Sequence, residues 1–286
     1  MPLTRPLHLN VTGQSPAPLS LWGMRALLFL LILFLTGPLA AQDTEVDVEL
    51  FLAVDVSRSM SPDELEIQRQ GYAAALTSAE VQAAISGGLL GRIAITYVEW
   101  AGEYNQRVLV PWTLIATPQD ARAVADTILA TDREGLRRTS ISGALIYATG
   151  DFAGNGFTGL RRVIDVSGDG PNNQGRPVHL ARDKALAEGF IINGLPLMTQ
   201  DALSAMWGIP DLDIYYQSCV IGGPGAFVIP VLSWDQFADA VRRKLVLEIA
   251  GMPARIIQAR TSTLSPYDCL VGEKMWEENR PWLVIP

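Results

Sequence analysis

Residues 48–60, VELFLAVDVSRSM, decide the fold of this chain. The first part is an unbroken apolar run with several β-branched residues, which is typical of a strand buried on both faces in the middle of a parallel sheet. The run ends at Asp55, and Ser57 and Ser59 follow at every second position. Open α/β sheets place their ligand sites at the carboxyl ends of such strands. The stretch therefore predicts a central strand and the edge of the sheet that carries a site.

Asp55, Ser57 and Ser59 offer one carboxylate and two hydroxyls. These are hard oxygen ligands, which suit Mg²⁺ or Mn²⁺ better than zinc or copper. The same residues also have a structural interpretation, in which the serines cap the next helix and Asp55 accepts hydrogen bonds from loop amides. These three residues alone leave both interpretations open.

Strand-like and helix-like segments alternate along the rest of the chain. Strands are predicted at 48–54, 92–100, 107–112, 161–167, 190–198 and 226–231. Helices are predicted at 61–78, from 117 onward, and at 140–152, 178–188 and 233–250, with N-terminal capping signals at Ser61, Thr117 and Ser233.

This alternation predicts an α/β fold, a doubly wound and mostly parallel six-stranded sheet with helices on both faces. We expect the strand order 3-2-1-4-5-6. The loop 101–106 is too short for a parallel return, so the strand 107–112 is predicted to be an antiparallel edge strand.

Residues 1–41 are predicted to be an upstream segment followed by a secretory signal peptide. Met24-Arg25 precedes an apolar run at 26–35, and Ala40-Ala41 follows it, which is the order of features in signal peptides. The apolar run is shorter than the roughly 20 residues of a membrane span. The true start could be Met24, and an uncleaved N-terminal anchor is an open alternative. Cleavage would place the mature chain in the periplasm or outside the cell, with no stable membrane insertion.

The remaining chain is strongly acidic. Removal of residues 1–41 takes away Arg5 and Arg25 and no acidic residue, so the formal charge changes from −8 to −10. Such a charge argues against nucleic acid and anionic membrane surfaces as partners. Residues 46–250 are enough for one large α/β domain, and 251–286 form a C-terminal tail.

Two further residues are expected at the same edge of the sheet as Asp55. Thr139 immediately precedes the helix predicted at 140–152, and Asp169 follows the strand predicted at 161–167. Taken singly, Thr139 could be a helix cap and Asp169 a turn residue. Their shared position with Asp55 in three separate loops favours a common metal site.

The motif Asp55-Val56-Ser57-Arg58-Ser59 resembles the D-x-S-x-S signature of von Willebrand factor A (VWA) domains. The stretch 139–145 is similar to the second metal loop of that family, and Asp169 is similar to the Asp of its third loop. The resemblance covers roughly 48–250. It implies a metal-ion-dependent adhesion site (MIDAS) that binds Mg²⁺ or Mn²⁺. Ser57, Ser59 and Thr139 would contact the ion directly, Asp55 and Asp169 largely through water, and an open position would accept a carboxylate from a protein partner.

Within the VWA family, the chain is most similar to a group of secreted bacterial VWA-like proteins. The stretches that carry this resemblance are 98–102, 167–173 and 219–227. The group has no assigned activity, so this closer resemblance adds no function.

Three other features bear on structure. Cys219 and Cys269 are predicted to form a disulfide that ties the tail to the domain, with two buried free thiols as the alternative. Asp165 lies within a predicted strand, and we interpret it as a buried Asp paired with a backbone or Arg donor and not as a ligand. The aromatic residues of 199–225 are interpreted as core, with a partner surface as the alternative.

The predicted function is a secreted binding module and not an enzyme. The main alternative is a metal-dependent phosphohydrolase with Asp55 as nucleophile. That chemistry needs a second carboxylate two residues on and a nearby Lys, but Ser57 occupies that position and the nearby cations are Arg58, Arg137 and Arg138. A structural domain with a vestigial metal site is the third hypothesis.

Overall fold

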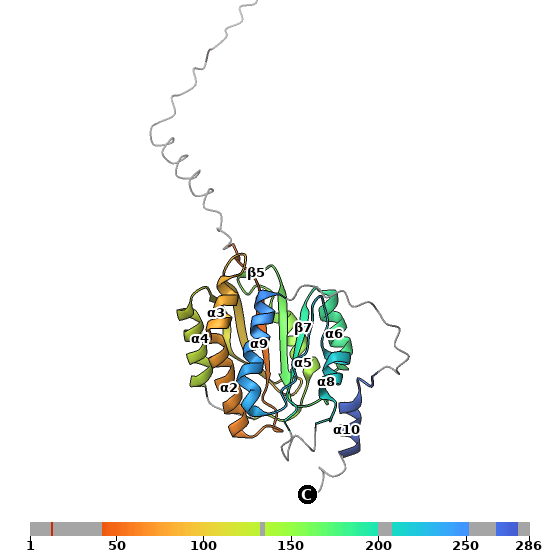
Figure 1. Cartoon of the computed structure of the whole chain (residues 1–286). Coiled ribbons are helices and arrows are strands. Elements are labelled where there is room, and N and C mark those ends of the chain that lie inside the picture. Colours follow the sequence, from red (N-terminus) through yellow and green to blue (C-terminus); the bar gives the residue numbers. More distant parts are fainter. Residues whose placement is uncertain (1–12, 14–41, 132–134, 200–207, 252–266, 280–286) are drawn as a thin grey trace, which may run out of the picture. The chain divides into compact units, whose positions relative to one another are not determined.

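The computed structural model describes residues 13, 42–131, 135–199, 208–251 and 267–279. The predicted signal peptide, Trp207 and the tail at 252–266 and 280–286 lie outside these residues. The described residues from 43 onward cluster into one compact unit. In this unit a central sheet is covered by helices on both faces (Figure 1).

The central sheet has five strands in the order β4-β3-β2-β6-β7. The pairing of β3 with β4 is antiparallel and the other pairings are parallel. The predicted α/β class, the order of the first five strands and the antiparallel edge strand are confirmed. The strands are β2 (Glu49–Asp55), β3 (Ile93–Trp100), β4 (Gln106–Ile115), β6 (Arg162–Gly168) and β7 (Ile191–Pro196).

The sixth strand, predicted at 226–231, is wrong. This segment runs beside β7 and makes isolated parallel bridges at Gly194 with Val228 and at Leu197 with Val231. Ile229 N donates to Gly194 O over 3.0 Å and Val231 N donates to Pro196 O over 2.9 Å, but Pro196 has no N–H to donate between them, so the ladder is interrupted. The sequence therefore has a sixth extended segment without a sixth regular strand. The separate two-stranded sheet of β1 (Thr44–Val46) and β5 (Phe157–Gly159) was not predicted.

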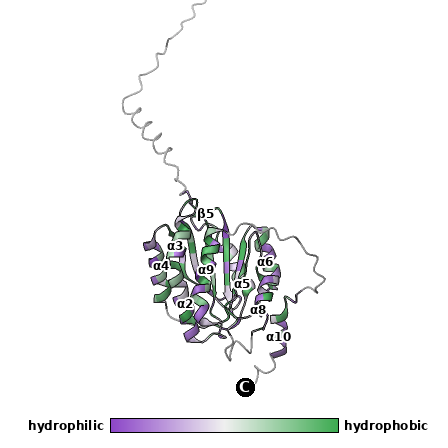
Figure 2. Ribbon diagram, viewed as in Figure 1, coloured by the Kyte–Doolittle hydropathy of each residue, from purple (hydrophilic) through white to green (hydrophobic). Residues whose placement is uncertain are grey.

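Strand β2 is buried on both faces, as its apolar run predicts. Leu50, Leu52 and Val54 belong to one hydrophobic core, whereas Phe51 and Ala53 belong to the core on the opposite face. This division follows the two-residue alternation of side chains along a strand. Figure 2 shows hydrophobic colour on the central strands and hydrophilic colour on parts of the surrounding helices.

Two groups of helices cover the two faces. On one face α2 packs against α4 and α9, and α3 packs against α9. On the other, α5 packs against α6, which contacts the π-helix η1. The elements are α2 (Pro62–Thr77), α3 (Ala79–Ser86), α4 (Pro118–Ala130), α5 (Ile141–Asp151), α6 (Val178–Ala187), α8 (Leu212–Tyr215), η1 (Tyr216–Val220), η2 (Trp234–Gln236), α9 (Phe237–Ala250) and α10 (Val271–Asn279).

The predicted caps are confirmed at two of three helix starts. Ser61 and Thr117 each form a capping box with the residue three positions on. Ser233 makes no side-chain cap hydrogen bond, because the chain there forms the short 3₁₀ turn η2 before α9 begins. Helix α3 was not predicted separately. Ser78 ends α2 and also caps α3, so the two helices are nearly continuous in sequence.

The C-terminal tail is held by the predicted disulfide. Cys219 and Cys269 are bonded, with their Cα atoms 5.5 Å apart. Tyr215 and Tyr216 are fully buried, which confirms the interpretation of these aromatics as core. No helix among the described residues is long and apolar enough to cross a membrane.

Candidate metal site

Asp55 is the last residue of β2 and is fully buried. Its Oδ1 accepts a 2.7 Å hydrogen bond from the backbone N–H of Ser57, which turns the chain back over the strand end. Its backbone carbonyl accepts a 2.9 Å hydrogen bond from Gln68 Nε2 on α2. The carboxylate is therefore fixed by the next loop and by the helix that follows it.

The first and third loops are joined by side-chain hydroxyls. Ser57 Oγ lies 2.9 Å from Ser59 Oγ. Ser59 Oγ donates a 2.9 Å hydrogen bond to Asp169 Oδ1. Asp55, Ser57, Ser59 and Asp169 thus form one connected set of oxygen-bearing side chains at the carboxyl ends of β2 and β6.

Thr139 belongs to the second loop and is nearly buried, with 6% of its surface exposed. Its N–H donates to Asn173 Oδ1 over 3.0 Å, and Asn173 N–H donates back to the Thr139 carbonyl over 2.8 Å. Leu136 N–H donates to the Val56 carbonyl over 2.8 Å, which ties the second loop to the first. These backbone contacts hold the loop of Thr139 against both of the other loops.

The side chains of Asp55 and Tyr216 leave no room for a larger residue at Gly168. A Cβ atom on Gly168 would lie 2.8 Å from Asp55 Oδ2 and 3.0 Å from the Tyr216 hydroxyl. Both of these oxygens are buried and have no hydrogen-bond partner among the described residues. Burial raises the pKa of Asp55 well above its usual range, and the negative charge of Asp169 raises it further.

An unpartnered buried carboxylate oxygen is costly unless a cation or donor compensates it. The hydroxyls of Ser57, Ser59 and Thr139 are hard donors of the kind that Mg²⁺ and Mn²⁺ bind. The set therefore fits a divalent cation. Among the described residues, no group of three or more His, Cys, Asp or Glu side chains could hold a metal ion. The candidate site has only two carboxylates, and its other three ligands are hydroxyls, so it is not a group of that kind.

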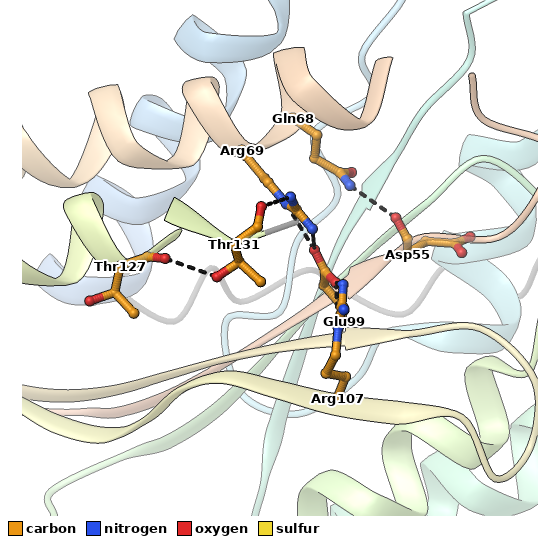
Figure 3. A network of polar contacts seen from close by, with 7 residues as sticks. All are labelled: Asp55, Gln68, Arg69, Glu99, Arg107, Thr127 and Thr131. Carbon is orange, nitrogen blue, oxygen red and sulfur yellow. Dashed lines mark hydrogen bonds and ion pairs between the residues drawn. The ribbon is translucent and has the colours of Figure 1, made fainter. Parts of the chain in front are cut away.

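An ion cluster around the buried Glu99 supports the helix that contacts Asp55. Figure 3 shows Gln68 and Arg69 projecting from α2 toward the strand ends. Arg69 Nη2 lies 2.6 Å from Glu99 Oε1, and Arg107 Nη2 lies 2.5 Å from Glu99 Oε2. Arg69 also donates to the Thr131 carbonyl at the end of α4. This cluster fixes α2 against β3 and β4, and so fixes Gln68 against Asp55.

Helix α10 borders the second and third loops. Asn172 Nδ2 donates a 2.8 Å hydrogen bond to Glu273 Oε1. The Arg138 guanidinium carbon lies 3.3 Å from the centre of the Trp276 ring, within the range of a cation–π contact. Arg138, the residue before Thr139, has a φ of 77°, an uncommon conformation for a residue with a side chain. The disulfide-held tail therefore contacts two of the three loops of the candidate site.

The sequence did not identify Gln68, Asn173 and Tyr216 as parts of this site. Asn173 lies in the stretch 167–173, which carries the family resemblance and was the one available signal. Gln68 and Tyr216 reach the site only through the packing of α2 and η1, which no local motif encodes.

Comparison with solved structures shows the fold of von Willebrand factor A domains. Proximal thread matrix protein 1 from the mussel byssus aligns with 16% identity and a TM-score of 0.54, covering 73% of this chain and 49% of that one. The same protein has been solved "with zinc occupied MIDAS motif" (15% identity, TM-score 0.50, 73% and 49% coverage).

Two bacterial structures give similar alignments. The von Willebrand factor type A protein from Catenulispora acidiphila has 14% identity and a TM-score of 0.52, covering 72% of this chain and 43% of that one. The pilus adhesin SpaC from Lactobacillus rhamnosus GG has 12% identity and a TM-score of 0.53, with 73% and 31% coverage. This chain therefore spans less than half the length of each of these proteins.

No curated protein sequence matches the chain. A family model matches residues 45–253, which is most of the chain. The chain therefore belongs to the family described as protein of unknown function (DUF1194).

Proposed function

We propose that this protein is a secreted or periplasmic binding module that engages a carboxylate of a protein partner through a bound Mg²⁺ or Mn²⁺ ion. The ion would be held by Asp55, Ser57, Ser59, Thr139 and Asp169. The observation that carries the proposal is Asp55 Oδ2, a fully buried carboxylate oxygen without a hydrogen-bond partner among the described residues. It lies in a cluster whose other members are hydroxyls and one further carboxylate.

The charge of this cluster favours an additional anionic ligand. Asp55 and Asp169 would bring a divalent cation close to neutrality if both contacted it directly, and contact through water would leave it more electrophilic. Mg²⁺ seldom fills its coordination shell with protein ligands alone and usually keeps positions for water or substrate oxygens. A carboxylate from a partner would complete the shell.

The solved relatives agree with a binding role. The name of one is that of a matrix protein and the name of another that of a pilus adhesin. The disulfide between Cys219 and Cys269 suits a secreted or periplasmic location, because disulfides persist in oxidising compartments.

We infer that the site is not catalytic. A phosphohydrolase that used Asp55 as nucleophile would need an acid/base carboxylate two residues on, where Ser57 stands. The chain has three lysines, Lys184, Lys244 and Lys274, and none is in the three loops of the site. Release of phosphate from a phosphate ester by the Mg²⁺-loaded protein, and its loss in Asp55→Asn, would overturn this inference.

The test uses acetate as a minimal carboxylate probe and Mn²⁺ as a paramagnetic ion. With limiting Mn²⁺ bound to the protein, the acetate proton signal should broaden more than with Mn²⁺ alone, because acetate would bind next to a slowly tumbling ion. Acetamide has the same shape without the charge and should not show this enhancement. Thr139→Ala should abolish the enhancement, whereas equal broadening by acetate and acetamide would contradict the proposal.

A further inference from the structure

A second cluster of buried polar groups lies away from the candidate metal site, between α9 and the middle of β6. Lys244 Nζ lies 2.5 Å from Asp165 Oδ1 and 2.5 Å from Glu248 Oε1. The side chains of all three residues are at most 1% exposed. Asn193 Nδ2 donates a 3.0 Å hydrogen bond to Glu248 Oε1. The partner of Asp165 is thus a lysine, where the sequence interpretation expected a backbone or Arg donor.

This cluster is poorly suited to a lasting set of charges. One ammonium group faces two carboxyl groups in a site without solvent, and burying ions costs more than a single pairing returns. Burial raises the pKa of Asp165, against the opposing effect of Lys244. Burial and the charge of Asp165 raise the pKa of Glu248 to about 7. A neutral carboxylic acid next to an amine is therefore accessible here.

We propose that Lys244 and Asp165 become joined by an intramolecular amide bond, an isopeptide, with Glu248 as the proton-transferring group. Transfer of one ammonium proton from Lys244 to the carboxylate of Asp165 leaves a neutral amine and a carboxylic acid. The amine attacks Asp165 Cγ, and a C–N bond forms. One Cγ–O bond breaks, and its oxygen leaves as water with one proton from the carboxylic acid and one from the amine. Glu248 takes the proton from the nitrogen and delivers it to the leaving oxygen. No oxidant, reductant or other reactant is needed.

The geometry supplies the proximity that this condensation needs. Because Oδ1 is bonded to Cγ, the amine nitrogen also lies beside the carbon that it attacks. The 2.5 Å ion pair between Lys244 Nζ and Asp165 Oδ1 holds the two reacting groups in contact in a site without solvent. Reactants fixed at such distances react as if at very high concentration, and a carboxyl group placed to move the proton adds general acid–base catalysis.

The surroundings also favour the product. The Phe227 ring centre lies 5.7 Å from Lys244 Nζ, and Tyr72 and Phe237 of the neighbouring core are fully buried. A neutral amide is less costly to bury in such a site than separated charges. A pocket of about 50 Å³ lies beside Glu248 and is lined by Asn193 and Phe227. This volume can accept a released water molecule.

The other two lysines give an internal comparison. Lys274 Nζ lies 2.6 Å from Asp268 Oδ2, a contact as close as that of Lys244, but these side chains are 58% and 50% exposed. Lys184 is also exposed. Its Nζ lies 3.8 Å from Oε1 of Glu188, which is four residues further along the chain and is also exposed. Water keeps such pairs charged, so proximity alone does not lead to condensation there.

The test is the intact mass of the wild-type protein with its disulfide reduced. We expect the mass to be lower than that of the sequence by one water molecule. Fragmentation should assign the loss to a peptide pair that contains Lys244 and Asp165. A lysine-specific protease should cut after Lys184 and Lys274 and leave the bond after Lys244 intact.

Three variants make the test specific. Lys244→Arg keeps a cation but removes the nucleophilic amine, so the water loss should disappear. Glu248→Gln keeps the shape, and the bond should form at least about a hundredfold more slowly. Lys274→Arg should retain the full water loss. If Lys244→Arg does not fold, the wild-type digest and Glu248→Gln still decide the question. A wild-type protein of full sequence mass that is cleaved after Lys244 would overturn the proposal.

Discussion

The Ser59 hydroxyl donates a 2.9 Å hydrogen bond to Asp169 Oδ1, across 110 positions of sequence. The bond joins the loop after β2 to the loop after β6, and Ser57 Oγ extends the contact at 2.9 Å from Ser59 Oγ. Three of the proposed ligands thus order one another at one end of the sheet. Ligands that are already ordered lower the entropic cost of binding an ion.

Ser59→Ala should lower Mg²⁺ affinity about tenfold, which corresponds to about 1.4 kcal/mol, close to the lower end of the range for a hydrogen bond to a charged group. The free energy of unfolding should change little, because Ser59 is partly exposed on a loop. Calorimetric titration measures the first quantity and chemical denaturation the second. The exposed Ser86, which bonds only to the Ala83 carbonyl of its own helix, gives the control Ser86→Ala. An equal loss of affinity in both variants would contradict the assignment of Ser59.

Gly168→Ala should disturb the site, because the added Cβ would lie 2.8 Å from Asp55 Oδ2 and 3.0 Å from the Tyr216 hydroxyl. We expect a loss of about 1–3 kcal/mol in the free energy of unfolding, as for other overpacked positions, and weaker binding of Mg²⁺. Gly150→Ala on α5 is the matched control, since its Cβ would meet nothing within 4 Å. Thermal denaturation that ranks the two variants in the opposite order would show that the packing around Asp55 is misread.

Removal of the disulfide with Cys219→Ser and Cys269→Ser should lower the free energy of unfolding by about 4 kcal/mol on the chain-entropy model for a sequence separation of 50. Because α10 contacts Asn172 and Arg138, proteolysis near the second and third loops should also become faster. Limited proteolysis with peptide mapping measures this effect. Unchanged protection of these loops would mean that α10 does not support them.

The sequence was sufficient for the features that depend on local pattern. The apolar run before Asp55 identified the central strand, and the short loop after Trp100 required an antiparallel neighbour. The two cysteines were paired because no other partner existed in the chain. The five proposed ligands were named because they lie in three loops at one edge of the predicted sheet and because their motifs resemble the metal-site motifs of von Willebrand factor A domains.

Features that depend on packing between distant elements could not be predicted in this way. Pro196 removes a donor from the ladder beside β7, and its effect depends on which segment lies next to it. Tyr216 reaches the site from a π-helix, a conformation that no sequence motif announced. Lys244 meets Asp165 only because α9 crosses the middle of β6.

The pH dependence of stability should reveal Glu248. Before Lys244 and Asp165 are joined, burial and the charge of Asp165 raise its pKa from 4.5 to about 7 in the folded protein. Burial is the larger cause, so the pKa stays raised after the bond has formed. The folded state therefore binds more protons than the unfolded state between these pH values, and the free energy of unfolding should fall as the pH rises from about 4.5 to about 7. Glu248→Gln should lack this decrease. Denaturation curves recorded across this pH range measure the free energy of unfolding of both proteins. If it falls equally in Glu248→Gln, the effect belongs to another group.

The most direct test of the metal-dependent account is a calorimetric titration of Mg²⁺ and Mn²⁺ into wild type, Asp55→Asn and Asp47→Asn. Asp47 is also buried, but it lies just before the opposite end of β2, where it accepts hydrogen bonds from the backbone of Leu90 and Arg92. The account predicts binding by wild type and by Asp47→Asn, and no measurable binding by Asp55→Asn. Equal heats from wild type and Asp55→Asn, or no binding by wild type at millimolar ion, would contradict it.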